Sequence, residues 1–140
     1  LITCPDSIES EYSFNSLINV RDNLVAFKRL FSGADGQGFD DFIRSEGFPE
    51  VSERMLTNVD NAISIANSLT GTLVEESARI TSSAEETACS NAFASPDSAS
   101  SDYGACRLNG AVKRVTDDLK IDFVTITGTN IPEGAQSDND

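Results

Sequence analysis

Histidine and tryptophan are both absent from this 140-residue chain. Without histidine a serine or cysteine nucleophile has no ordinary general base, which excludes the histidine-dependent hydrolase mechanisms for this chain. The same absence removes the side chain on which most catalytic zinc sites depend. The sequence also lacks glycine-rich phosphate loops of the GxxxxGK[ST] or GxGxxG kind. By its own residues, the chain therefore does not present an enzyme.

Basic residues are scarce, with 10 lysines and arginines against 23 aspartates and glutamates, which gives a formal net charge of −13. A nucleic-acid partner is not expected, because phosphate binding needs a concentrated basic surface. We interpret the acidic surface chiefly as a solubility device, with cation binding and adaptation to a salty habitat as the alternatives.

Long apolar runs are missing as well, so the sequence predicts no transmembrane segment, which would need roughly 18 to 20 apolar residues. No signal peptide is visible at the start. The chain begins at Leu1 without a methionine, which suggests a processed or excised product. A secretion signal could have been removed earlier, so its absence decides nothing about location.

Cysteine occurs three times. A disulfide between Cys89 and Cys106 would close the polar stretch between them and stabilise the fold by roughly 3 kcal/mol in the chain-entropy picture. Zinc binding is the weaker interpretation, because the chain has neither a CxxC spacing nor histidine. We therefore predict this disulfide and a periplasmic, cell-envelope or extracellular location. Cys4 remains either free or paired with a segment outside this sequence.

Apolar residues recur at helical spacing through most of the chain. The pattern predicts an all-α fold: an up-and-down helical bundle of three to four long helices plus a short one, in a single domain over residues 1–140. Residues 90–104, rich in serine, alanine and aspartate, have no periodicity and are expected to form a flexible loop. The expected helices cover approximately residues 11–31, 38–45, 49–69, 73–88 and 108–126.

The sequence makes specific predictions for the last helix and for the first. The last helix should end at Gly128, a suitable left-handed C-cap, and Leu119→Ala within it should cost roughly 2 to 5 kcal/mol if that side chain is buried. On the first helix the expected core side consists of Phe14, Leu17, Ile18, Leu24, Val25, Phe27, Leu30 and Phe31.

Acidic side chains offer few candidate sites. Residues 35–41 superficially resemble a calcium loop, but with Gly38 as the turn glycine the closing glutamate position is Arg44, so we interpret them as an interhelical turn. The acidic pairs Glu75–Glu76, Glu85–Glu86 and Asp117–Asp118 fit solvated helix faces. The remaining candidates for a weakly bound hard cation are Asp138 and Asp140, near the C-terminus; the identity of the metal is not indicated.

The order of several segments resembles the C-terminal half of an imelysin-family protein. The segments that carry the resemblance are Phe14 to Leu24, Phe31-Ser32-Gly33 followed by Gly38-Phe39-Asp40-Asp41-Phe42, Asn58 to Leu69, Leu119 to Phe123, Ile131-Pro132 and Asp138-Asn139-Asp140. The resemblance extends over nearly the whole chain except residues 90–104.

The resemblance implies a cell-envelope protein built of two helical bundles and often encoded in iron-regulated loci. Some imelysin-like proteins are classed as metallopeptidases, and others resemble alginate- or metal-binding proteins. Their Gly-x-His-x-x-Glu motif belongs to the N-terminal half and has no counterpart in a chain without histidine. Two hypotheses follow: a non-catalytic binding or structural half that serves iron or other metal acquisition, or one half of a metal-dependent peptidase whose catalytic motif lies on a missing segment or another chain.

Overall fold

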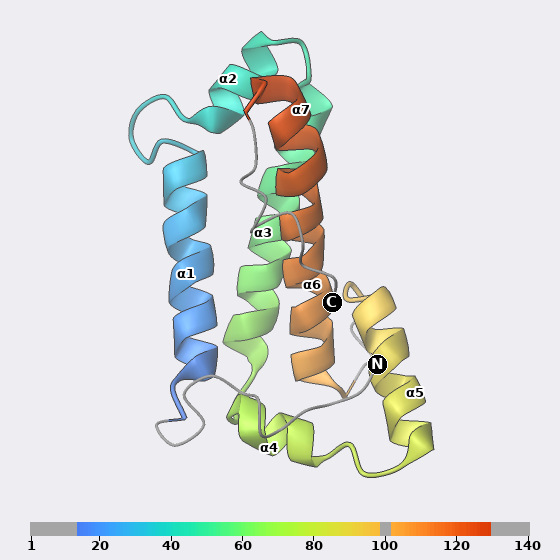
Figure 1. Cartoon of the computed structure of the whole chain (residues 1–140). Helices are drawn as coiled ribbons and strands as arrows, with labels where there is room; N and C mark the ends of the chain where they lie inside the picture. The colour runs from blue at the N-terminus through green and yellow to red at the C-terminus, as the bar shows by residue number, and fades with distance from the viewer. Residues whose placement is uncertain (1–13, 99–101, 130–140) are drawn as a thin grey trace.

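The computed structural model describes residues 14–98 and 102–129, and within these ranges it contains helices and turns but no strand. The predicted all-α helical bundle is thereby confirmed (Figure 1). None of the described helices is long and apolar enough to cross a membrane. In chain order the elements are α1 (Ser16–Phe31), α2 (Phe39–Ser45), α3 (Pro49–Ser68), α4 (Leu73–Ala78), α5 (Ser83–Ala94), α6 (Gly104–Asp118), the π-helical segment η2 (Leu119–Phe123) and α7 (Val124–Thr127).

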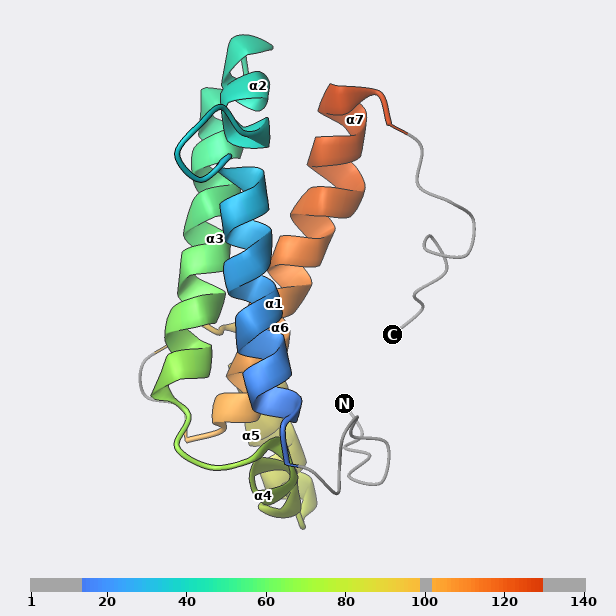
Figure 2. The same ribbon diagram turned by 90° about the vertical axis from the view of Figure 1, so that its left-hand side faces the viewer.

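Helix α3 lies at the centre of the bundle and packs against α1, α2 and α6. The chain runs up through α1, down through α3 and up again through α6, which η2 extends into α7 (Figures 1 and 2). Helix α2 lies at one end of the bundle and α4 at the other, while α5 packs along α6. Pro49 at the first turn of α3 is well placed, because that position needs no backbone N–H donor.

Two apolar clusters fill the space between these helices. One cluster joins α1, α3 and α6, and the other joins the end of α1 to α2 and the start of α3. The buried members of the first are Leu17, Leu24, Val59, Ala62, Ile65, Ala66, Leu108, Ala111 and Val115, and those of the second are Phe31, Ile43, Val51 and Met55. Burial of this apolar surface provides the main driving force for folding.

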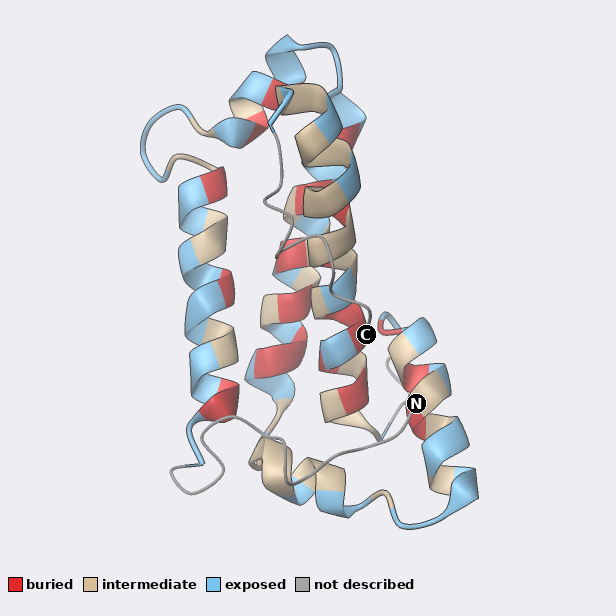
Figure 3. Ribbon diagram, viewed as in Figure 1, coloured by how far each residue is buried: buried red, intermediate tan, exposed pale blue. Residues whose placement is uncertain are grey.

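The core face predicted for α1 is wrong for half of its members. Leu17, Leu24 and Phe31 are buried and Phe27 is partly buried, as predicted. The four that are exposed instead are Phe14, Ile18, Val25 and Leu30. The reason is that α1 packs mainly along α3 and leaves its opposite face uncovered, as the burial colours show (Figure 3).

The single helix predicted over residues 73–88 is two helices, and residues 90–94, predicted to be part of a loop, are helical. Thr72 begins α4 by accepting a hydrogen bond from the Glu75 N–H at 3.1 Å, and Ser82 begins α5 by accepting one from the Glu85 N–H at 3.4 Å. Because each N-cap begins a helix of its own, residues 73–94 form two helices, and no continuous apolar stripe joins them. Residues 99–101 of the predicted loop lie outside the described residues.

The C-terminal helix differs from the predicted one in two respects. It begins at Gly104, and it passes through the π-helical segment η2 before ending at Thr127. The predicted C-cap is confirmed, because Gly128 has φ 64° in the left-handed region. Leu119 is only partly buried, although it packs against both clusters, so the cost expected for Leu119→Ala falls to the lower end of its range, about 2 kcal/mol.

Gly110 permits the close packing of α5 against α6. A Cβ atom at this position would lie 2.0 Å from the carbonyl oxygen of Phe93. We expect Gly110→Ala to separate the two helices locally and to reduce the free energy of unfolding by about 1 to 3 kcal/mol, the usual range for overpacking. Urea unfolding would measure this. Gly36→Ala is the matched control, since a Cβ there meets only the Gly33 oxygen at 3.5 Å; equal stability of the two variants would contradict the prediction.

Candidate functional site

The predicted metal candidates Asp138 and Asp140 lie outside the described residues, which end at Thr129. Within residues 14–98 and 102–129, no three histidine, cysteine, aspartate or glutamate side chains come close enough together to hold a metal ion. The described part of the chain therefore assigns no metal centre.

The sulfur atoms of Cys89 and Cys106 lie at disulfide distance, in agreement with the predicted pair. The bond joins α5 to α6, whereas the sequence placed Cys89 at the edge of a loop. Both cysteines are buried together with Ala92, and Ile80 and Tyr103 pack against them. This third cluster fixes the small, weakly amphipathic α5 to the bundle.

A polar cluster between α3 and the last helix was not predicted. Arg54 Nε donates to Asp118 Oδ1 at 3.1 Å, and Arg54 Nη2 donates to Asp122 Oδ2 at 2.5 Å. Asn58 Nδ2 donates to the second Asp118 oxygen at 2.7 Å. Asp118 is buried, so its interpretation as part of a solvated acidic face is wrong, although its neighbour Asp117 does pair with Lys113 near solvent.

The spacing of the cluster was the signal that sequence reasoning missed. Arg54 and Asn58 are four residues apart, as are Asp118 and Asp122, so each pair lies on one face of its helix. Every carboxylate oxygen of Asp118 has a donor, and the cluster lies where the helix turns from α to π geometry. The arrangement orients the last helix against α3.

Glu85 is a carboxylate whose pKa departs from its ordinary value. The backbone N–H of Thr81 donates to its carboxylate at 2.8 Å, and the Ser82 and Thr81 hydroxyls donate as well. These hydrogen bonds, led by the one from the Thr81 backbone, hold the pKa of Glu85 below its ordinary value of 4.5.

We expect this lowered pKa to make the start of α5 sensitive to acid. Because the folded state binds the proton less readily than the unfolded one, the stabilisation is present above pH 4.5 and is lost as the pH falls through the lowered pKa. NMR titration of the Glu85 carboxyl would give the pKa, and amide shifts of α5 should follow it. Glu85→Gln should remove this dependence, while Glu86→Gln should leave it; an unshifted Glu85 would contradict the prediction.

A tight turn between α1 and α2 forms part of a pocket at one end of the bundle. Gly33 has φ 66°, and a Cβ there would lie 2.4 Å from the backbone of Gln37. A Cβ at Gly38 would lie 2.3 Å from the Phe31 carbonyl oxygen. Only glycine tolerates these approaches, so the two glycines close the turn that the sequence predicted and direct α2 across the end of the bundle.

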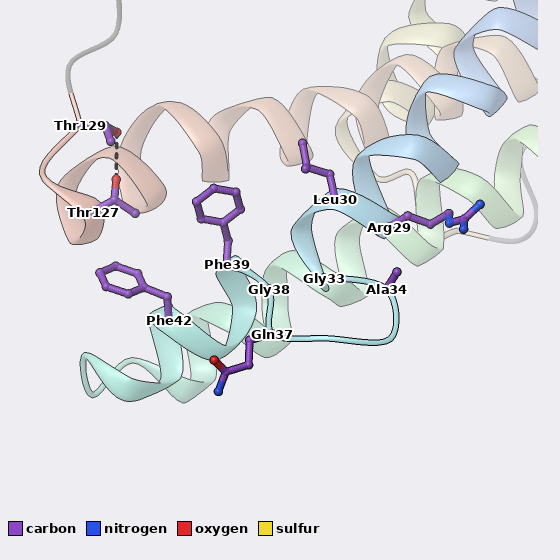
Figure 4. A pocket seen from close by; sticks show the side chains of 10 residues that line it. All are labelled: Arg29, Leu30, Gly33, Ala34, Gln37, Gly38, Phe39, Phe42, Thr127 and Thr129. Atoms are coloured by element: carbon purple, nitrogen blue, oxygen red, sulfur yellow. Dashed lines mark hydrogen bonds between the residues drawn. The ribbon is translucent and has the colours of Figure 1, made fainter.

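The pocket lies between the end of α1, α2 and α7 and has a volume of about 760 Å³. Figure 4 shows Leu30, Phe39 and Phe42 extending into the space that separates the first two helices from α7. Across this space, Thr127 and Thr129 share a hydrogen bond of 2.8 Å. The pocket thus offers apolar side chains on one wall and hydroxyl groups on the other.

Phe39 and Phe42 are 44% and 42% exposed, which is unusual for side chains of this size. Phe39 also packs edge-on against Phe123, with ring centroids 5.2 Å apart, so it links α2 to the last helix. Arg29 is the charged residue of the lining, and it extends away from the two rings (Figure 4). Pockets of this volume and apolar character commonly accept ligands or side chains of partners.

Comparisons with protein-family models, with curated proteins and with solved structures found no match to this chain. The resemblance to the imelysin family consequently stays a prediction from the sequence.

Proposed function

We propose that this chain is the non-catalytic binding or structural half of an imelysin-like envelope protein. The observation that supports the proposal is where the resembling segments lie. Two of these segments contribute Gly33, Gly38, Phe39 and Phe42 to the lining of the apolar pocket. A third segment, Leu119 to Phe123, reaches the same end of the bundle, where the Phe123 ring contacts Phe39. A binding role for this end of the bundle would explain why these segments lie together.

The partner in this proposal is an N-terminal half or a second chain of the same protein, which would place an apolar side chain in the pocket. The cargo implied by the resemblance is iron or another metal, which this chain would hold weakly, with Asp138 and Asp140 as the candidate ligands. An extracytoplasmic location is part of the proposal, and the cysteine pair at disulfide distance is compatible with it.

The pocket can be tested with the apolar dye anilinonaphthalene sulfonate, whose fluorescence rises when it leaves water. Phe42→Ser should weaken dye binding at least about fivefold, because it removes an aromatic wall. Phe48→Ser is the matched control, since Phe48 is also 42% exposed but does not line the pocket. Equal binding by the wild type and both variants would show that the pocket is not a binding surface.

The non-catalytic part of the proposal is tested by calorimetric titration with zinc, ferric and calcium ions. We expect no tight zinc binding, because zinc catalysis needs about three protein ligands and an open position for water. Submicromolar one-to-one zinc binding, or zinc-dependent cleavage of an unfolded protein substrate, would overturn the proposal in favour of a peptidase half. Weak binding that disappears when residues 137–140 are removed would assign the metal to the tail.

The intact mass of the native protein tests the proposed partner. We expect this chain to be recovered as part of a longer polypeptide or in a complex with a second chain. Recovery from the native source as a lone 15.0 kDa chain would contradict its assignment as a half.

A further inference from the structure

The pocket between α1, α2 and α7 lies directly beside the point where the described part of the chain ends. Thr129, the last described residue, lines this pocket together with Thr127. The Thr127 hydroxyl donates to the Phe123 carbonyl oxygen at 2.7 Å, so the Thr129 hydroxyl supplies the proton for the 2.8 Å hydrogen bond between the two threonines. This bond holds Thr129 against the last helical turn, and the residues that follow it therefore start from a wall of the pocket.

The side chains that line the pocket follow a definite order across it. Figure 4 shows Thr129 at one end of the lining, then Phe42, Phe39 and Leu30, and finally Arg29 at the other end. Among the described residues, Arg29 has no ion-pair partner. The pocket thus has an apolar middle and an unpaired positive charge at the end opposite Thr129.

The sequence after Thr129 repeats this order. Its next residues are Asn130, Ile131, Pro132 and Glu133, which lie outside the described residues. Proline disfavours helix in the residue before it, so Ile131 favours extended backbone. In an extended chain every second side chain points to the same side, so Ile131 and Glu133 share the side of Thr129, which lines the pocket. At about 3.3 to 3.6 Å per residue, Ile131 reaches up to about 7 Å beyond Thr129 and Glu133 up to about 14 Å.

We propose that residues 130–133 occupy this pocket in the free chain and act as an internal competitor for its ligand. In this arrangement Ile131 packs against the aromatic side chains of the pocket, and the Glu133 carboxylate pairs with the Arg29 guanidinium. The proposal rests on the proposed function, because it treats the pocket as a binding surface. It adds that a partner's apolar side chain enters only by displacing the chain's own Ile131.

Two features favour this segment as the occupant. Covalent attachment a few residues away gives it an effective concentration in the millimolar range, so that even the weak contact of one aliphatic side chain is populated. Its charge is also complementary, since residues 130–140 contain three acids and no base, whereas Arg29 is the charged residue of the lining. An external ligand binds only those molecules in which the pocket is open, so its apparent affinity falls in proportion to that fraction. The competition therefore weakens external binding severalfold without abolishing it.

Methyl NMR of the whole chain with labelled isoleucine tests the occupancy directly. We expect the ring currents of the phenyl groups to shift the Ile131 methyl resonances upfield, and we expect nuclear Overhauser contacts between these methyls and the Phe42 ring. Phe42→Ser should remove the contacts and most of the shift. Phe48→Ser should leave both, since Phe48 is equally exposed but does not line the pocket. Ile131 methyls at their random-coil positions in the wild type would overturn the proposal.

A charge exchange tests the position of Glu133. Glu133→Lys should move the Ile131 methyl resonances towards their random-coil positions, because the introduced lysine faces Arg29. The double variant Arg29→Glu/Glu133→Lys should restore the upfield shift. Glu86→Lys on α5, which changes the net charge by the same amount as Glu133→Lys, should leave the shift unchanged. A double variant no better than the single one would overturn the pairing with Arg29.

Dye binding separates this inference from the proposed function. Ile131→Ser should raise the affinity for anilinonaphthalene sulfonate at least about threefold, because it removes the competitor. Asn130→Ser, on the opposite side of the extended segment, should not change it. Dye binding that depends on Phe42 but does not respond to Ile131→Ser would overturn the internal competitor and leave the proposed function in place. Dye binding that does not depend on Phe42, even in the Ile131→Ser variant, would overturn the proposed function instead, and the methyl resonances alone would then decide where the segment lies.

Discussion

Phe31→Ala is expected to reduce the free energy of unfolding by about 3 to 5 kcal/mol, the usual cost of removing a buried phenyl ring. Phe31 is 1% exposed and lies where α1, α2 and the start of α3 meet. Its ring stacks on that of Phe27 at a centroid distance of 5.7 Å. Truncation would leave a cavity bordered by Ile43 and Met55, neither of which can fill it without moving its helix.

Thermal and urea unfolding followed by circular dichroism would measure the loss. The neighbouring Leu30 provides the control, since it is 67% exposed and its replacement by alanine should change stability by no more than about 0.5 kcal/mol. If both variants cost the same, the junction between α1, α2 and α3 is not packed as described.

Replacing both Cys89 and Cys106 by alanine is expected to cost roughly 3 kcal/mol, the chain-entropy estimate for a loop of this length. The two cysteines are 17 residues apart in sequence. The loss of stability should affect α5 first, because its other contacts with α6 are the close approach at Gly110 and a few small apolar side chains. Hydrogen exchange at the amides of α5 should therefore accelerate more than exchange in α3.

A reductant supplies the control for the disulfide. The wild type should lose a similar amount of stability in dithiothreitol, whereas the double variant should not respond to it. Equal sensitivity of the two proteins, or free thiols at both positions in freshly isolated protein, would contradict the disulfide and weaken the proposal of an extracytoplasmic location.

The long helices could be predicted because their apolar residues keep a helical period and their ends carry specific signals. Pro49 begins α3 and Gly128 ends α7, as these residue types favour. The break between α4 and α5 was missed because it depends on hydrogen bonds that the Thr72 and Ser82 side chains accept from backbone N–H groups, and these caps change no apolar spacing. Spacing alone could not show which side of α1 is buried, since Ile18 and Val25 repeat with the same period as Leu17 and Leu24.

The candidate site was predictable only in part. The turn from Gly33 to Gly38 follows from its glycine content, but the pocket beside it depends on α7, whose residues are about 90 positions further along the chain. The Arg54–Asp118 contact joins residues 64 positions apart, and a carboxylate on a polar helix face gives no sign of burial. Both features arise from tertiary packing, which a local pattern does not encode.

The π-helical segment Leu119–Phe123 accommodates one residue more than an α-helical turn would hold. Deleting one residue within it would restore ordinary α geometry and leave the residues beyond it with nearly the same orientation around the helix axis. Deleting one residue within α6 instead would rotate everything beyond by about 100°. Phe123 and Ile126, which pack against the cluster beside α2, would then point elsewhere. The last helix can therefore lose one residue in the π-helical segment, but not in α6, without losing the wall that closes one side of the pocket.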